Sequence, residues 1–284
     1  MSGSSSQIKV AIAGTGSYVP ERVLTNSDLE IMVDTSYEWI TTRTGIKERR
    51  IAAEDEFTSH MAVKASRKAI EQAGISPSEV ELIIVATITP NTLTPATACY
   101  VQHELGAHQA VAFDISAACS GFLYAMRLAE RMISGGTCKN ALILGAEKLS
   151  AFVNWDDRST CVLFGDGAGA ALLKRAREEE GQILAIDIGT DGGQTDLLNI
   201  PGGGSACPIT QENADQRLST LAMVGTDVFK QAVTRMRASA NSVIERSGLR
   251  PGDIKLLIPH QANLRIIEAI TKRIEIPEDR VFVN

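Results

Sequence analysis

One segment occurs twice in the chain, and this repeat restricts the possible folds more than any other feature. Residues 69–86 (AIEQAGISPSEVELIIVA) align without gaps to residues 243–260 (VIERSGLRPGDIKLLIPH), an offset of 174 positions (243 − 69). Each copy is typical of a helix end, a glycine stop, a proline turn and an apolar strand. The repeat predicts two similar α/β halves, 8–177 and 181–284. The alternative is that any helix–glycine–loop–strand unit looks alike.

Strand and helix patterns alternate along the chain. Apolar spacing of the helical period predicts helices at 27–33, 36–43, 58–73, 96–105, 119–133 and 264–274. Apolar, β-branched runs predict strands at 8–12, 80–87, 111–115, 140–144, 170–173 and 254–258. Gly14 and Gly16 are expected to end the first strand in a turn. The alternation predicts a parallel sheet covered by helices.

Composition excludes several classes of function. The chain has 28 Lys+Arg against 34 Asp+Glu, a net charge of −6, which argues against nucleic acid as the main partner. No apolar run approaches the roughly 18 residues that would cross a membrane. Five cysteines without CxxC spacing favour reduced thiols in the cytoplasm over disulfides or a metal site. Residues 1–7, rich in Ser and Gly, are typical of a disordered leader rather than a signal peptide.

Cys119 is the candidate nucleophile. It follows the predicted strand 111–115 and opens the predicted helix 119–133, where the helix dipole is expected to lower the thiol pKa. Small neighbours on both sides would let a substrate approach closely. The alternative is a packed, unreactive thiol, which is common for free cysteines.

His260 and three larger side chains are further candidates. His260 follows the predicted strand 254–258 through Pro259, and strand ends of this kind bind ligands, so it is a candidate acid, base or hydrogen-bond donor. It could equally be a loop histidine bonded to backbone. Trp39, Arg43 and Arg158 suit a nucleotide, because an indole stacks on a purine and guanidinium groups bind phosphates. Otherwise they are ordinary surface residues.

Four motifs in order along the chain form a recognisable set. They are WITTRTGIKERRI from Trp39, DISAACSGF around Cys119, FGDGAGAALL from Phe164 and PHQANLRII from Pro259. Together they resemble the β-ketoacyl-acyl-carrier-protein synthase III family of the thiolase superfamily. The resemblance implies a thiolase-like α/β fold with layers α-β-α-β-α in two similar halves. It also implies a homodimer that uses a CoA thioester as substrate and needs no cofactor or metal.

The resemblance further implies a condensation that initiates fatty-acid synthesis. Cys119 would take an acyl group from acyl-CoA as a thioester and release CoA. Malonyl-acyl carrier protein would then lose carbon dioxide, and its carbanion would attack the thioester to give a 3-oxoacyl-carrier product. A neutral His260 would donate to the malonyl thioester oxygen as enolate charge develops.

Binding roles follow from the same resemblance. Trp39 and Arg158 match adenine contacts, and Thr35 and Arg43 match contacts near the CoA head group. Phe229 and Asn263 match the pantetheine arm. The segment implied to contact the carrier protein consists of Gln261, Ala262, Asn263, Leu264 and Arg265.

Three departures from the family pattern stand out. In members specific for acetyl-CoA, a phenylalanine from the partner subunit commonly closes the acyl pocket. The matching position here is Thr94, so primers longer than acetyl are expected to fit. Thr226 replaces an asparagine of the pantetheine site. The sequence ends at Asn284, 24 residues after His260 (284 − 260), before the catalytic asparagine and Gly-rich oxyanion segment of the family. The C-terminal half is therefore expected to be truncated, with little condensation by these residues alone.

Two alternative functions remain open at this point. One is a related thiolase-superfamily acyltransferase of specialised metabolism, because a cysteine and a histidine do not identify the second substrate. The other is a non-catalytic partner subunit, suggested by the missing asparagine. The presence of both Cys119 and His260 argues against the second alternative.

Overall fold

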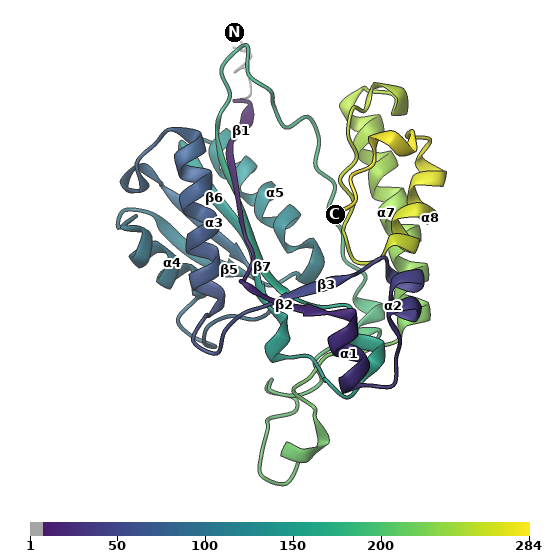
Figure 1. Ribbon diagram of the computed structural model, residues 1–284. Coiled ribbons are helices and arrows are strands. Elements are labelled where there is room, and N and C mark those ends of the chain that lie inside the picture. Colours follow the sequence, from purple (N-terminus) through teal and green to yellow (C-terminus); the bar gives the residue numbers. More distant parts are fainter. Residues whose placement is uncertain (1–7) are drawn as a thin grey trace. The chain divides into compact units, whose positions relative to one another are not determined.

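The computed structural model describes residues 8–284, so the segment 1–7 interpreted as a leader lies outside the described residues. The chain forms two compact units, and both are discontinuous in sequence (Figure 1). The first holds the chain up to Arg22, Arg50–Lys148 and Asp166–Ile186, and the second holds Val23–Arg49, Leu149–Gly165 and Asp187–Asn284. These units follow different boundaries from the halves 8–177 and 181–284, which stay a prediction about repeated topology.

A mixed five-stranded sheet forms the centre of the first unit, in the order β1-β7-β6-β4-β5. Its strands are β1 (Val10–Tyr18), β4 (Leu82–Ala86), β5 (Val111–Ile115), β6 (Asn140–Lys148) and β7 (Asp166–Arg175). β4 runs parallel to β5 and β6, whereas β7 is antiparallel to both β1 and β6. The prediction of a parallel sheet was therefore wrong for β1 and β7. Between β6 and β7 the only α-helix is the short α6 (Arg158–Cys161), and β7 returns antiparallel, a pairing that needs no long helical crossover.

Helices cover both faces of this sheet. α3 (Thr58–Ala73) and α4 (Thr97–Leu105) lie on one face, and α5 (Gly121–Ser134) lies on the other (Figure 1). The side chains of β4 alternate between the two cores: Ile83 packs with the α3 and α4 side, and Ile84 packs with the α5 side. Every residue of β4 is buried, as its uninterrupted apolar run predicts.

The first strand is longer than the sequence pattern predicts. β1 continues through Gly14 and Gly16, because α3 lies directly against the strand. A Cβ on Gly14 would lie 2.2 Å from the Ala69 carbonyl oxygen, and one on Gly16 would lie 2.1 Å from that of Ala65. These glycines permit close approach of a helix rather than a turn, so the predicted turn was wrong.

The remaining helices and strands complete the fold. They are β2 (Arg22–Thr25), α1 (Asn26–Met32), α2 (Tyr37–Thr44), β3 (Glu48–Ile51), β8 (Leu198–Asn199), β9 (Ala222–Met223), α7 (Gly225–Ser247) and α8 (Leu264–Ile274). α7 packs against α8 around Val233, Ile266 and Ile270. Among residues 8–284, no helix has both the length and the hydropathy to span a bilayer.

The repeated segment adopts the same local conformation in both copies. Gly74 ends α3 with φ 69°, and Gly248 ends α7 with φ 73°. A 3₁₀ turn follows each glycine, at Pro77–Glu79 and at Pro251–Asp253, again 174 positions apart. The predicted helix, glycine stop and proline turn are thus confirmed in both copies.

The second copy departs from the first in its strand. The predicted strand 254–258 is reduced to a single bridge, between Leu257 and Val281, so this prediction was wrong. Among residues 8–284, Leu257 exchanges backbone hydrogen bonds only with the segment 280–282, and Leu256 and Ile258 are 53% and 67% exposed.

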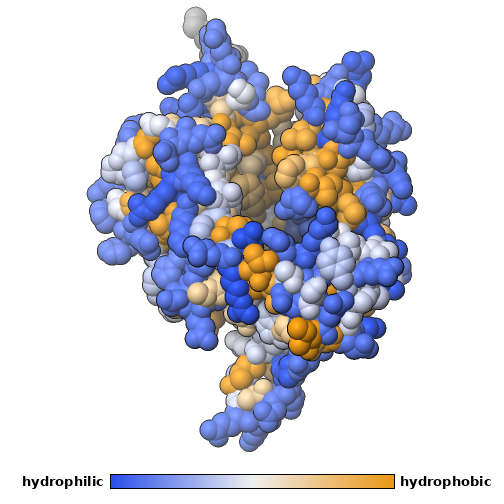
Figure 2. All heavy atoms as spheres, viewed as in Figure 1, coloured by the Kyte–Doolittle hydropathy of each residue, from blue (hydrophilic) through white to orange (hydrophobic). Residues whose placement is uncertain are grey.

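Figure 2 shows hydrophobic patches among the hydrophilic residues of the visible face.

Candidate active site

Cys119 lies on a tight turn between β5 and α5. It occupies a 3₁₀ turn, Ala118–Ser120, and α5 begins at Gly121, later than the predicted start. Ala118 has φ 44°, in the left-handed region that non-glycine residues rarely adopt. A Cβ on Gly121 would lie 2.9 Å from that of Ala86, so the glycine lets the start of α5 approach β4. The turn leaves Cys119 exposed to solvent at the carboxyl end of β5.

The pKa of Cys119 is raised, contrary to the expected effect of the helix dipole. Desolvation by the surrounding protein is the main cause, and the negative charge of Glu147 adds to it. A hydrogen bond from the residue's own backbone N–H opposes the rise but does not outweigh it. Cys119 precedes α5 rather than opening it. Part of the residue surface is exposed, but the protein atoms packed around the sulfur desolvate the thiolate enough to decide the direction of the pKa shift. Near neutral pH the group is therefore mainly a thiol.

Glu147 is a partly buried carboxylate near Cys119 that sequence reasoning did not select. It lies near the end of β6 and accepts hydrogen bonds from the backbone N–H groups of Ile88 (2.8 Å) and Thr89 (3.1 Å). The hydroxyls of Thr87 (3.2 Å) and Thr89 (2.5 Å) also donate to it. Burial raises the pKa of the Glu147 carboxyl, and these donors oppose the rise. The sequence signal that could have identified Glu147 was an acidic residue shortly after the apolar run of the predicted strand 140–144.

His260 lies in the second unit, between the bridge at Leu257 and the start of α8. Its residue surface is exposed, while the neighbouring Pro259 is buried. Desolvation of the ring lowers the pKa of His260, so the imidazole is neutral near pH 7. This direction agrees with the neutral donor that the resemblance implies. Cys119 and His260 belong to different compact units, and their pairing stays a prediction.

The structure brings Trp39, Arg43 and Arg158 together. The guanidinium carbons of Arg43 and Arg158 lie 4.7 Å and 5.2 Å from the centre of a Trp39 ring, within cation–π range. Ser36 fixes the start of α2 by accepting the Trp39 backbone N–H at 3.1 Å. Arg158 Nη1 donates to the Asp34 carbonyl oxygen at 2.8 Å. These contacts collect an aromatic face and two cations at one place.

Thr35 adds an unsatisfied polar atom to this cluster. Its neighbours in the chain are Asp34, which holds Arg158, and Ser36, which caps α2. Within residues 8–284, the Thr35 hydroxyl is a buried side-chain oxygen without a hydrogen-bond partner. Since buried polar groups are nearly always paired, this hydroxyl suits a bound polar ligand.

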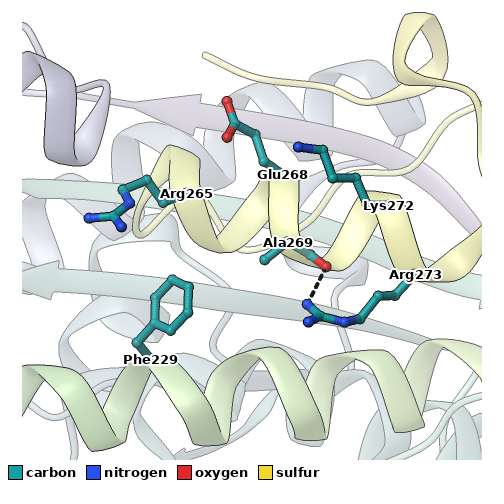
Figure 3. Close-up of a pocket in the computed structure, with 6 residues that line it drawn as sticks. All are labelled: Phe229, Arg265, Glu268, Ala269, Lys272 and Arg273. Carbon is teal, nitrogen blue, oxygen red and sulfur yellow. Dashed lines mark hydrogen bonds between the residues drawn. The ribbon is translucent and has the colours of Figure 1, made fainter.

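A groove lies between α7 and α8. It has a volume of about 460 Å³ and is lined by Phe229, Arg265, Glu268, Ala269, Lys272 and Arg273 (Figure 3). Its lining carries three cationic side chains and one anionic side chain, so it suits an anionic partner. Arg273 Nη1 donates to the Ala269 carbonyl at 2.9 Å.

The segment 261–265 leads from His260 into this groove. Asn263 caps α8 by accepting the Arg265 backbone N–H at 2.9 Å. Gln261 Nε2 donates to the carbonyls of Pro259 (2.9 Å) and Phe282 (3.1 Å). Both side chains therefore shape the backbone, and Arg265 is exposed on α8.

The remaining candidate, Thr94, lies on the loop between β4 and α4 of the first unit, where it is exposed. Across residues 8–284, no group of three or more His, Cys, Asp or Glu side chains is placed to hold a metal ion.

Sequence comparisons place these residues in a wider context. The family described as 3-oxoacyl-(acyl-carrier-protein) synthase III matches residues 113–192, and its C-terminal domain matches 244–284. A β-ketoacyl-acyl-carrier-protein synthase III of Caldanaerobacter subterraneus subsp. tengcongensis is 52% identical over 98% of this chain and 84% of the relative. The protein of the same name from Clostridioides difficile is 50% identical over 97% of this chain and 84% of its own length.

Solved structures agree with this result. 3-Oxoacyl-acyl-carrier-protein synthase III from Aquifex aeolicus superposes with a TM-score of 0.89 at 49% identity, covering 97% of this chain and 84% of that chain. The priming β-ketosynthase of the R1128 polyketide biosynthetic pathway has a TM-score of 0.85 at 36% identity, covering 97% and 81%.

Proposed function

Since the chain belongs to the β-ketoacyl-acyl-carrier-protein synthase III family, as its four motifs predict, we propose that Cys119 and His260 are its catalytic residues. The chain is a condensing acyltransferase of fatty-acid initiation with the family's thiolase-like α/β fold. The observation that carries the assignment is the exposed Cys119 on the turn between β5 and α5. A backbone in this strained conformation is typical of functional sites.

Cys119 performs the first half-reaction. Its sulfur attacks the acyl-CoA carbonyl, a thioester forms, and the carbon–sulfur bond to CoA breaks. The thiol proton leaves with the CoA sulfur, so the half-reaction is balanced without any added reagent. Because the pKa of Cys119 is raised, only a minor fraction is thiolate near neutral pH, and acylation is expected to accelerate as pH rises.

His260 serves the second half-reaction. Malonyl-acyl carrier protein binds, carbon dioxide leaves, and the electron pair of the broken bond becomes an enolate. The neutral imidazole donates a hydrogen bond to the enolate oxygen, where negative charge develops. The carbanion attacks the acyl thioester and restores the Cys119 sulfur. Loss of carbon dioxide supplies the carbanion, so this chemistry requires no redox cofactor.

The CoA site consists of the residues gathered around Trp39. The indole and Arg158 hold adenine, while Arg43 and the unpaired Thr35 hydroxyl meet the phosphate end of CoA. Phe229 and Asn263 line the path of the pantetheine arm.

The carrier protein docks on segment 261–265 and on the adjoining groove. Arg265, Lys272 and Arg273 present positive charge there, which suits an acidic carrier. This surface is formed by the second unit alone.

Two further assignments concern assembly and location. β5 is an edge strand, and its Val111 is 59% exposed, so a second copy pairing along β5 would complete the sheet in a homodimer. All five cysteines are free, which supports a cytoplasmic location.

The acyl pocket is assigned at Thr94. A small side chain at this position leaves room for primers longer than acetyl. Rates of Cys119 acylation across acyl-CoA lengths test this assignment, and a sharp optimum at acetyl would contradict it.

The proposed function is tested in two stages. Intact mass after incubation with acyl-CoA should show one added acyl group on the wild-type chain and none on Cys119→Ala. Malonyl-acyl carrier protein is then added, and a 3-oxoacyl-carrier product separates condensation from the acyl transfers of specialised metabolism. The higher identity to fatty-acid enzymes, 49–52% against 36% for the polyketide enzyme, favours condensation in fatty-acid initiation. Absence of acylation would favour the non-catalytic alternative.

A further inference from the structure

The loop that follows β4 is held at both ends by carboxylates of neighbouring strands. Glu147 of β6 accepts the four hydrogen bonds from residues 87–89 described above. Asp114 of β5 accepts the backbone N–H groups of Thr97 (2.6 Å) and Ala98 (2.8 Å) at the start of α4. β5 and β6 are the two partners of β4 in the sheet, so the loop is fixed from both sides.

Side-chain bonds also hold the middle of the loop. Asn91 donates its Nδ2 to the Ser59 hydroxyl at 2.8 Å and accepts the Ser59 backbone N–H at 3.0 Å. Its own backbone N–H donates to the Thr97 hydroxyl at 3.1 Å. Residues 92–95 form the exposed tip of the loop, and Leu93 within it is 93% exposed. The Thr92 hydroxyl lies 3.3 Å from the Tyr100 hydroxyl of α4. The position of Thr94 therefore depends on how its two ends are anchored.

Glu147 is the stronger of the two anchors because it accepts four hydrogen bonds from the loop, whereas Asp114 accepts two. Oε1 accepts the Ile88 N–H, and Oε2 accepts the Thr89 N–H and both threonine hydroxyls. A charged acceptor makes each of these bonds stronger than a neutral one would. Hydroxyl groups can reverse their roles, but a backbone N–H can only donate.

We propose that Glu147 is a positioning residue that fixes the loop carrying Thr94 and thereby sets which acyl chain lengths Cys119 accepts. This inference rests on the proposed function, in which Thr94 borders the acyl group. Glu147 touches no reacting atom in this proposal, and it acts through residues 87–89. Loosening the anchor would shift the tip 92–95 and change the room available to long acyl chains more than to acetyl.

The test variant is Glu147→Gln. If the amide oxygen of the variant keeps the hydrogen bond from the Ile88 N–H, the amide NH₂ group faces the Thr89 N–H. Two hydrogen-bond donors then face each other, and the Thr89 bond is lost. The control is Glu81→Gln, at the opposite end of β4, where Glu81 Oε2 accepts the Lys139 backbone N–H at 2.8 Å. Both variants replace a carboxylate that accepts a backbone N–H from another part of the sheet.

The measured quantity is the ratio of the rate constants for acylation of Cys119 by octanoyl-CoA and by acetyl-CoA. Each acylation is monitored by intact mass. Glu147→Gln is expected to change this ratio about fivefold, the size of one lost hydrogen bond, while Glu81→Gln keeps it within about twofold. A general loss of stability, or a change in the reactivity of the Cys119 thiol, alters the acylation rates with both substrates alike and leaves the ratio unchanged. An unchanged ratio in Glu147→Gln, or an equal change in Glu81→Gln, would overturn the positioning role.

A second variant covers the case in which Glu147→Gln does not fold. Thr87→Val removes one hydroxyl donor to Glu147 at a buried site where valine fits, and the ratio should move in a smaller step. If Thr87→Val leaves the ratio unchanged when Glu147→Gln cannot be measured, the inference fails. If wild-type Cys119 accepts no acyl group from any acyl-CoA, the proposed function fails first, and this outcome is distinct from an unchanged ratio.

Discussion

The Arg43 guanidinium lies 4.7 Å from the centre of a Trp39 ring, one helical turn further along α2. Arg158, which begins α6 much later in the chain, approaches a Trp39 ring as well, at 5.2 Å. Two cations beside one indole, with the unpaired Thr35 hydroxyl on the adjoining segment, suit an aromatic and anionic group, which is why the nucleotide of CoA is proposed to bind there.

Replacing Trp39 by alanine should weaken acyl-CoA binding. Loss of the stacking surface is expected to raise the KM for acyl-CoA about tenfold, with little change in kcat. An acyl thioester of N-acetylcysteamine, which lacks the nucleotide, should react with variant and wild type at equal rates. Trp155→Phe, a change at the second tryptophan, is the matched control. Equal losses on both thioesters would contradict the assignment of Trp39 to the nucleotide.

Replacing Glu147 by glutamine should lower the pKa of Cys119. A fixed negative charge disfavours the thiolate, so its removal favours ionisation and raises the alkylation rate at neutral pH. The pH dependence of carbamidomethylation of Cys119 by iodoacetamide, read by peptide mass, measures this shift. Glu81→Gln should leave the profile unchanged. A profile that stays in place, or moves to higher pH, would show that Glu147 does not act on the sulfur.

Reversing the charge of Lys272 should weaken binding of the carrier protein. Lys272→Glu is expected to raise the Kd for malonyl-acyl carrier protein about tenfold at low salt and less at high salt. Acylation by acyl-CoA, measured in parallel, should not change. Glu268→Gln removes the one negative charge of the same groove and should bind the carrier at least as tightly as wild type. Weaker binding by both variants would argue against an electrostatic contact.

Adding a methyl group at Gly14 should destabilise the first unit. A Cβ there would lie 2.2 Å from the Ala69 carbonyl oxygen, so α3 and β1 must separate. Gly14→Ala is expected to lower the free energy of unfolding by about 2 kcal/mol or more. Gly169→Ala is the control, because no atom lies within 4 Å of its would-be Cβ. Equal unfolding midpoints in urea for the two variants would contradict the close approach.

Local sequence signals predicted most of the first unit. α3 and β5 have the predicted bounds. A glycine stop ends α3, and the sequence of β5 (VAFDI) is apolar except for Asp114. The same reasoning was wrong for Gly14 and Gly16. A glycine that admits a packed helix and a glycine that turns the chain look alike in sequence, and only the position of α3 separates them.

At the candidate active site, too, local sequence signals predicted some residues and missed what depends on tertiary packing. Cys119 and His260 follow predicted elements, and their neighbouring motifs identified the family. Glu147 was missed because its donors come from residues 87–89, far away in sequence and adjacent only in the sheet. The direction of the Cys119 pKa shift was also wrong, because desolvation depends on tertiary crowding that a helix position does not reveal.

The most direct test of the account is peptide mapping of the wild-type chain after brief exposure to acyl-CoA. A single acyl group is expected on Cys119, with none on Cys99, which is also exposed and serves as an internal control. Cys119→Ala should remain unmodified. An acyl group distributed over both exposed cysteines, or absent from Cys119, would contradict the assignment of Cys119 as the nucleophile.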